Sequence, residues 1–149
     1  MKRNLIKVGI TFFLIFTIIN AVWFANSYLT YHPFTKTIPK HMSGIYVYND
    51  PTTNYSYNIK FPDYLTFTGN LGVSDNKGSS LIIWPGLFGQ NYEFGFLLTD
   101  GTKTDYVYVD KNMELLYPSE ELSKVFHDYE NLMTGLWQGA HNKWDEVWP

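Results

Sequence analysis

Four histidines and 14 acidic residues are the side chains of this 149-residue chain best suited to acid–base or metal chemistry. His127 and His141 fall on one predicted helix, but their separation of 14 residues puts them about 21 Å apart along its axis, too far to share an ion. His141 and Asp145 are four residues apart and could pair, yet the sequence offers no third ligand. His32 and His41 lie in a segment without a hydrophobic period. We therefore predict no metal site and no cofactor.

Nucleophilic catalysis is also poorly supported. The chain has no cysteine, which excludes thiol nucleophiles, iron–sulfur clusters and thiolate zinc sites. It has no Gly-x-Ser-x-Gly motif. Hydrolysis by paired carboxylates needs only two acids about 5–10 Å apart. Asp100, Asp105 and Asp110 are the candidates, although each lies at or beside a predicted turn, where Asp is common. We expect no enzymatic activity, and a small hydrolase stays open as an alternative.

The best candidate for a contact site is the loop over residues 84–91. Its proline and two glycines indicate a loop, and it carries the large apolar side chains of Trp84, Leu87 and Phe88. If exposed, these three residues would form a patch suited to a protein or glycan partner. The alternative is that Trp84 and Phe88 fold back and fill the core.

An uncharged stretch of 18 residues, 8–25, must position everything that follows it. At about 1.5 Å per residue it forms a helix of about 27 Å, close to the hydrocarbon thickness of a bilayer. We predict a transmembrane signal-anchor helix over residues 8–29, which contacts the lipid bilayer, and a cytoplasmic stub over residues 1–7.

The orientation of this helix follows from the basic residues beside it. Lys2, Arg3 and Lys7 precede the apolar stretch, and the next basic residue after it is Lys36. Because positive charge is retained in the cytoplasm, we expect a single-pass protein of the cytoplasmic (inner) membrane, with the N-terminus inside and the C-terminal domain outside.

A cleaved signal peptide is the rival interpretation of the same stretch. Ala25 and Ser27 are small residues with the spacing of a cleavage site after Ser27, which would leave a secreted or periplasmic domain. The apolar stretch is longer than the 7–15 residues usual for a signal peptide. Its end is also bulky, at Trp23 and Phe24. We favour the uncleaved anchor. A helix buried within a soluble fold is the third alternative.

Charge and cysteine usage restrict the partners of the exported part. Eight lysines, no arginine and all 14 acidic residues lie beyond the anchor. This acidic balance argues against nucleic acid and against attraction to anionic lipid head groups. Without cysteine the domain has no disulfide and must fold on its apolar core alone.

The exported part divides into a linker and one domain. Residues 30–43 show no hydrophobic period and are expected to be a juxtamembrane linker. Residues 44–149 are expected to form one extracytoplasmic domain, which begins with short stretches of alternating apolar residues. About seven strands are predicted, at 44–49, 55–61, 64–68 with an extension to 71–73, 81–84, 92–98, 104–109 and 113–117. The short connections favour an antiparallel meander.

The C-terminal segment predicts a long amphipathic helix. Ser119 can cap its start, and Glu120 and Glu121 favour the positive end of the helix dipole. Apolar residues then recur every three or four positions from 122 to 148. Gly135 and Gly139 indicate close contact with the sheet or a bend. The fold class is α+β: a transmembrane helix, a small antiparallel meander and a helix packed on it.

These features lead to three functional hypotheses. The first is a membrane-anchored interaction, accessory or immunity-type module that binds another protein of the cell envelope. The second is a cell-wall glycan-binding module or small hydrolase, which requires exposed rings among Tyr55, Tyr57, Tyr106 and Tyr108. The third is an accessory subunit whose anchor packs with other transmembrane helices, for which small or polar anchor residues such as Asn20 give a weak signal.

Overall fold

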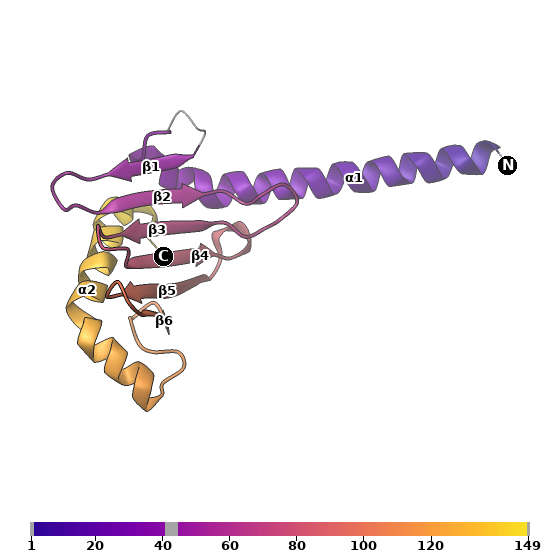
Figure 1. Ribbon diagram of the computed structural model, residues 1–149. Helices are drawn as coiled ribbons and strands as arrows, with labels where there is room; N and C mark the ends of the chain where they lie inside the picture. The colour runs from indigo at the N-terminus through magenta and orange to yellow at the C-terminus, as the bar shows by residue number, and fades with distance from the viewer. Residues whose placement is uncertain (1, 41–44, 149) are drawn as a thin grey trace.

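The chain combines two long helices with one antiparallel sheet (Figure 1). The computed structural model describes residues 2–40 and 45–148, and side chains from Ile6 onward. Helix α1 (Lys2–Tyr31) projects from the domain at the N-terminus, and helix α2 (Glu120–Trp144) closes the fold. The predicted α+β class is confirmed. One helix, within Ile6–Thr37, is long and apolar enough to cross a membrane.

The sheet is a six-stranded meander in which every strand pairs with its neighbours in the sequence. The strands are β1 (Tyr46–Asn49), β2 (Ser56–Lys60), β3 (Asn70–Ser74), β4 (Ser80–Pro85), β5 (Tyr92–Thr99) and β6 (Thr104–Val109). Short 3-10 helices lie at η1 (His32–Thr37), η2 (Leu87–Gly89) and η3 (Asp145–Val147). All five strand pairs are antiparallel, as the short connections require.

One of the expected strands is absent from the described part of the chain, and another begins later than predicted. Residues 64–68 are not a strand: Leu65 has a positive φ of 59°, and the N–H of Thr66 donates to the carbonyl of Asp63 in a turn. The strand in this region is β3, which contains residues 71–73, predicted as the extension of 64–68. Residues 113–117 contribute only an isolated bridge between Leu115 and Val109. This explains six strands where about seven were expected.

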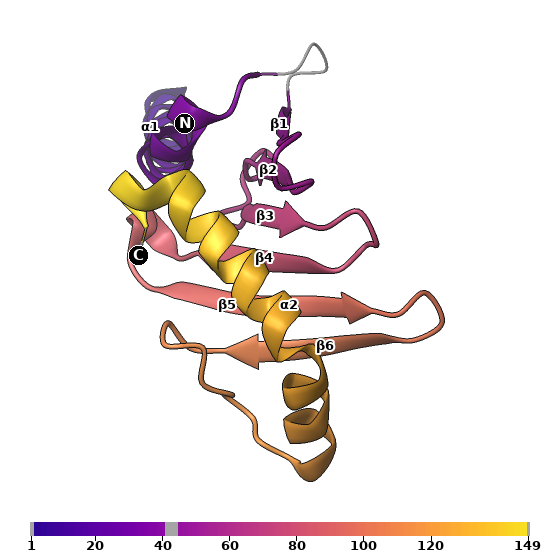
Figure 2. The same ribbon diagram turned by 90° about the vertical axis from the view of Figure 1, so that its left-hand side faces the viewer.

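The core lies between one face of the sheet and α2, which crosses the strands on that face (Figure 2). The alternation predicted in β2 holds, since Tyr57 and Ile59 are buried. On α2, an apolar stripe is buried at Met133, Leu136, Ala140 and Trp144. Burying each large side chain of this kind stabilises the fold by about 1.5–3 kcal/mol. Ser119 caps α2 as predicted, with its Oγ accepting the N–H of Leu122 at 3.1 Å.

The two glycines of α2 let the helix approach Tyr55 closely. A Cβ at Gly139 would lie 2.9 Å from Cδ2 of Tyr55, and a Cβ at Gly135 would lie 2.7 Å from its hydroxyl oxygen. The close contact expected for these glycines is therefore with the residue that immediately precedes β2. A larger residue at either position requires Tyr55 to move.

Helix α1 runs directly into the domain. Where the structure describes the segment expected to be a linker, residues 30–40, Tyr31, Phe34 and Ile38 are buried in the core. The ring of Phe34 meets that of Trp144 edge-on, with centroids 5.9 Å apart. Packing therefore holds the domain against the end of α1. The expectations placed on His41 and Gly44 lie outside the described residues.

Candidate functional site

The face of the sheet opposite α2 carries a group of aromatic side chains on its last three strands. Trp84 of β4 and Tyr108 of β6 reach toward each other across Gly95 of β5, which pairs with Tyr108 in the sheet register. Their ring centroids are 6.1 Å apart and their planes differ by 28°. A Cβ at Gly95 would lie 2.9 Å from the ring of Trp84 and 3.3 Å from that of Tyr108. The glycine thus provides the space in which the two rings meet.

Further apolar side chains extend this surface. Tyr106 is 60% exposed and Tyr108 is 44% exposed, while Ile82 and Leu97 on the same face are half-buried. Tyr106 pairs with Leu97 in the register, so the two lie side by side. We call this surface the open-face patch; it consists of Ile82, Trp84, Leu97, Tyr106 and Tyr108. Exposed aromatic groups of this kind are typical of recognition surfaces.

The predicted contact loop is divided between two places. Trp84 belongs to the open-face patch, whereas Leu87 and Phe88 lie in η2 beside α1 and are 56% and 46% exposed. The alternative in which Phe88 fills the core is therefore wrong. Phe88 has a positive φ of 55°, and its N–H donates to Oδ1 of Asn26 at 2.7 Å. The structure thus connects this loop to α1.

A stripe of side chains on α1 forms the junction with the domain. Asn26 is fully buried, with Ser27 and Thr30 nearly so. One turn earlier, Trp23 donates its ring N–H to the carbonyl of Asp63 at 3.2 Å. These side chains recur every three or four residues along α1, so they share one face.

The stripe extends in both directions along α1. The hydroxyl of Tyr64 donates to Oδ1 of Asn20 at 2.6 Å, and the ring of Tyr64 meets that of Trp23 edge-on at 5.3 Å. At the other end, the buried hydroxyl oxygen of Tyr31 accepts the N–H of Gly69 at 2.8 Å.

The sequence does contain evidence for this junction, in the form of polar residues within a predominantly apolar segment. Asn20, Asn26 and Thr30 are polar residues at helical spacing near the end of an apolar helix. Polar groups on such a helix require partners, because an unpaired polar group in an apolar environment is costly. Asn20 has such partners, because its Oδ1 accepts from the hydroxyl of Tyr64 and its Nδ2 donates to the carbonyl of Phe16 at 2.8 Å. Within the described residues, the buried Nδ2 of Asn26 and Oγ1 of Thr30 have no hydrogen-bond partner.

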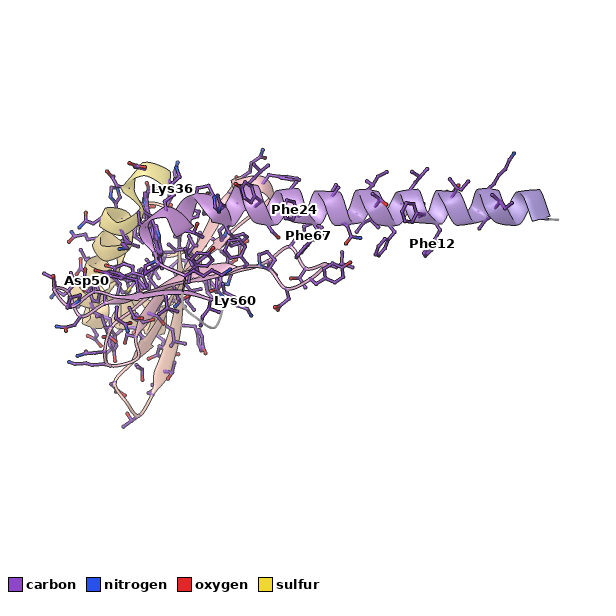
Figure 3. All side chains as sticks on the ribbon, turned by 90° about the horizontal axis from the view of Figure 1, so that it is seen from above. Phe12, Phe24, Lys36, Asp50, Lys60 and Phe67 are labelled. Carbon is purple, nitrogen blue, oxygen red and sulfur yellow. The ribbon has the colours of Figure 1, made fainter. Side chains whose placement is uncertain are left out.

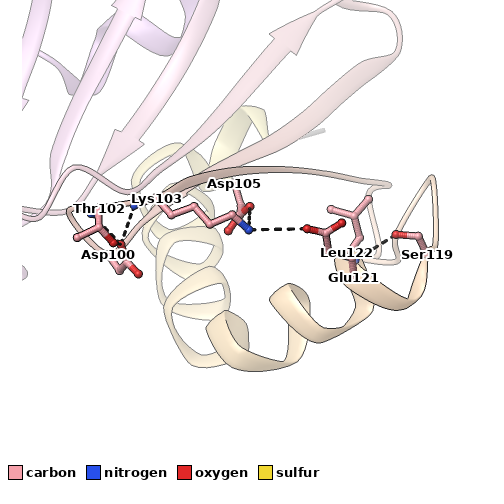
Figure 4. A network of polar contacts seen from close by, with 7 residues as sticks. All are labelled: Asp100, Thr102, Lys103, Asp105, Ser119, Glu121 and Leu122. Atoms are coloured by element: carbon pink, nitrogen blue, oxygen red, sulfur yellow. Dashed lines mark hydrogen bonds and ion pairs between the residues drawn. The ribbon is translucent and has the colours of Figure 1, made fainter.

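The acidic residues considered for hydrolysis serve as turn residues or ion-pair partners. Asp100 accepts the backbone N–H groups of Thr102 and Lys103 at 2.8 and 2.9 Å, and these bonds lower its pKa to about 2 (Figure 4). Asp105 pairs with Lys103 at 2.8 Å. Asp110 accepts the N–H of Glu114 at 2.8 Å, which is the main reason that its pKa is lowered.

The remaining polar candidates are dispersed over the described residues. His141 lies 3.6 Å from Asp145, both exposed, and no three His, Asp or Glu side chains there gather as metal ligands. The chain also holds one Ser-x-x-Lys sequence, residues 74–77. It forms the turn between β3 and β4, in which Asp75 accepts the N–H groups of Lys77 and Ser79.

The four tyrosines proposed as a glycan platform lie on opposite faces. Tyr57 is buried in the core, and Tyr55 packs against the glycines of α2. Tyr106 and Tyr108 are exposed on the open-face patch. Half of that platform is therefore unavailable to a ligand, and the other half has Trp84 beside it.

Comparison with known proteins provides no relative. No protein-family model, no curated protein and no solved structure matches this chain.

Proposed function

We propose that the chain is a single-pass membrane protein, anchored by α1 with its N-terminus in the cytoplasm, whose external domain binds another envelope protein through the open-face patch. The observation that carries the proposal is the combination of one spanning-length apolar helix with a domain that exposes Tyr106 and Tyr108 on an uncovered sheet face. The excess of Lys and Arg before the apolar stretch supports this orientation.

The junction supports an anchor that is not cleaved. A protease that cut after Ser27 would have to reach a bond within a continuous helix, beside the buried side chains of Asn26 and Ser27. Proteolysis favours exposed, flexible segments. Cleavage would also remove Asn26, the acceptor for the N–H of Phe88. The external domain is thus built to retain α1.

The chemistry of the open-face patch suits a protein partner. Trp and Tyr are the residue types that most often dominate binding energy at protein interfaces. The exported part has eight lysines against 14 acidic residues, so it favours a partner with an apolar centre and a basic rim. The absence of disulfides does not affect this surface, because the sheet register fixes Trp84 and Tyr108 in place.

Site-specific photo-crosslinking tests the proposal. A benzophenone amino acid at Tyr106 of the full chain, expressed in its own cells, should give one discrete, protease-sensitive adduct. Trp84→Ala in the same chain should reduce that adduct at least tenfold. The matched control is the same crosslinker at Tyr117, an equally exposed tyrosine outside the open-face patch. Equal adducts from both positions would contradict a specific contact at the open-face patch.

A glycan-binding module is the second candidate, favoured by the nearly parallel rings of Trp84 and Tyr108 above Gly95. Sugar rings stack on such faces through their apolar C–H groups. In the same experiment, an adduct that resists protease and disappears after digestion with a glycan hydrolase would select this candidate over the protein partner.

A further inference from the structure

The meander places its connections alternately at two ends of the sheet. The connections over residues 61–69 and 86–91 lie at one end, and the turns over residues 50–55, 75–79 and 100–103 lie at the other. Figure 1 shows α1 approaching along β2, so that the first pair of connections faces the N-terminal part of α1. We call residues 61–69 and 86–91 the anchor-side loops. The turn after β6 is carried away from them by the sheet twist (Figures 1 and 2).

The two ends differ sharply in composition. The anchor-side loops expose Tyr64, Leu65, Leu87 and Phe88 to solvent. The three opposite turns expose no large apolar side chain, and each begins with an aspartate that accepts backbone N–H groups. Four large apolar side chains at one end therefore remain partly exposed to solvent in the described chain, whereas the other end is suited to water.

Direct contacts fix the anchor-side loops to α1. In residues 61–69, the hydroxyl of Tyr64 donates a hydrogen bond to Asn20, and the carbonyl of Asp63 accepts one from the ring N–H of Trp23. In residues 86–91, the backbone N–H of Phe88 donates a hydrogen bond to Oδ1 of Asn26. Figure 3 shows Phe67 beside the part of α1 that carries Phe24, while Phe12 lies farther along α1 and Asp50 at the opposite end of the domain.

The position of these contacts along α1 determines how deep they would lie in a bilayer. Asn20 lies five residues before Ala25, the last residue of the apolar stretch 8–25, which is about 8 Å along a helix axis. If residues 8–25 span the hydrocarbon, the Tyr64–Asn20 pair lies within the outer leaflet and the Phe88–Asn26 pair lies near its surface. Tyrosine, tryptophan and leucine side chains are favoured at this depth.

We propose that the anchor-side loops insert into the outer-leaflet interface of the bilayer that α1 spans. The inference rests on the proposed anchoring, since α1 carries these loops to the membrane. Leu65, Leu87 and Phe88 form the apolar part of the contact and enter the lipid, beside the exposed pair of Asp63 and Lys60 at 3.9 Å. The hydroxyl of Tyr64 donates to Oδ1 of Asn20. Because the external domain is acidic, insertion does not need anionic lipid and occurs in a neutral bilayer. The domain is thereby held upright, with its polar turns away from the membrane.

The absence of native cysteine makes a depth measurement direct. Full-length single-cysteine variants carry an environment-sensitive fluorophore at Leu65→Cys or Leu87→Cys. Lys77→Cys, in an opposite turn, is the matched control for the dye's own affinity for lipid. Ile15→Cys, in the middle of α1, reports independently whether α1 spans. Each chain is reconstituted in phosphatidylcholine vesicles that contain lipids with a quencher at a shallow or a deep position, and iodide serves as the aqueous quencher.

The expected result has three parts. Ile15→Cys is quenched by the deep lipid, and Leu65→Cys and Leu87→Cys are quenched several-fold more by the shallow lipid than by iodide. Lys77→Cys is quenched by iodide alone.

Quenching of both loop probes by iodide only, with Ile15→Cys still quenched by the deep lipid, would overturn the insertion and leave the anchor standing. Loss of the deep quenching at Ile15→Cys would overturn the anchor itself. Lipid quenching at Lys77→Cys would overturn the upright orientation, because the domain would then lie flat on the bilayer.

Discussion

At the scale of single residues, Asn26 is the polar group that connects α1 to the rest of the domain most directly. It is fully buried, and its Oδ1 is the acceptor for the N–H of Phe88. Asn26→Ala leaves that N–H without a partner, which should lower the free energy of unfolding of the domain by about 1–3 kcal/mol. Denaturant unfolding of the full chain in detergent, followed by tryptophan fluorescence, measures this. Leu29→Ala, an exposed position on the same helix, is the control, and an equal loss from both would contradict the role of Asn26.

Asp100 should control part of the acid sensitivity of the domain. Its hydrogen bonds to Lys103 and Thr102 lower its pKa to about 2 in the folded chain, below the ordinary 3.8. A lowered pKa stabilises the fold above pH 3.8, and this contribution is lost as the pH falls toward 2. Asp100→Asn should therefore flatten the dependence of Tm on pH between 4 and 2. Superimposable profiles for the two proteins would show that the turn does not hold the carboxylate in this way.

At the scale of elements, the packing of α2 on Tyr55 gives a pair of opposite expectations. Gly135→Ala meets only the hydroxyl of Tyr55, so in a Tyr55→Phe background it should stabilise the protein by up to about 1 kcal/mol through helix propensity. Gly139→Ala meets the ring itself and should destabilise by about 1–3 kcal/mol in both backgrounds. The measurement is the Tm of five proteins: the unmodified chain, Tyr55→Phe, Gly139→Ala, and the double variants of Tyr55→Phe with Gly135→Ala or with Gly139→Ala. Stabilisation by Gly139→Ala would mean that the ring of Tyr55 does not lie against Gly139.

The sequence predicted those elements whose periodicity is undisturbed. The alternation of Tyr57 and Ile59 and the stripe of α2 correspond directly to the buried residues. The prediction over residues 64–68 was wrong, because apolar content alone does not show that Leu65 adopts a positive φ. Tyr31, Phe34 and Ile38 have the spacing of one helix face, but Pro33 and Pro39 beside them favoured a linker. In the structure these three side chains are buried around η1.

The site could be predicted only in part for a related reason. Trp84, Leu87 and Phe88 were identified as apolar residues in a loop, but their division between two surfaces depends on the sheet register and on the end of α1. Gly95 carries no side chain that could suggest a site, and its role appears only where Trp84 and Tyr108 meet above it.

At the scale of the whole molecule, we propose that an intact α1 holds the domain on the outer side of a membrane. The direct test is reaction of full-length single-cysteine chains with a membrane-impermeant maleimide in intact spheroplasts, followed by the intact mass of the labelled chain. Lys77→Cys should be labelled without lysis on a chain of the full 17.4 kDa, and Lys7→Cys should be labelled only after lysis. A labelled chain that begins at Tyr28, or labelling of Lys77→Cys that requires lysis, would contradict the account.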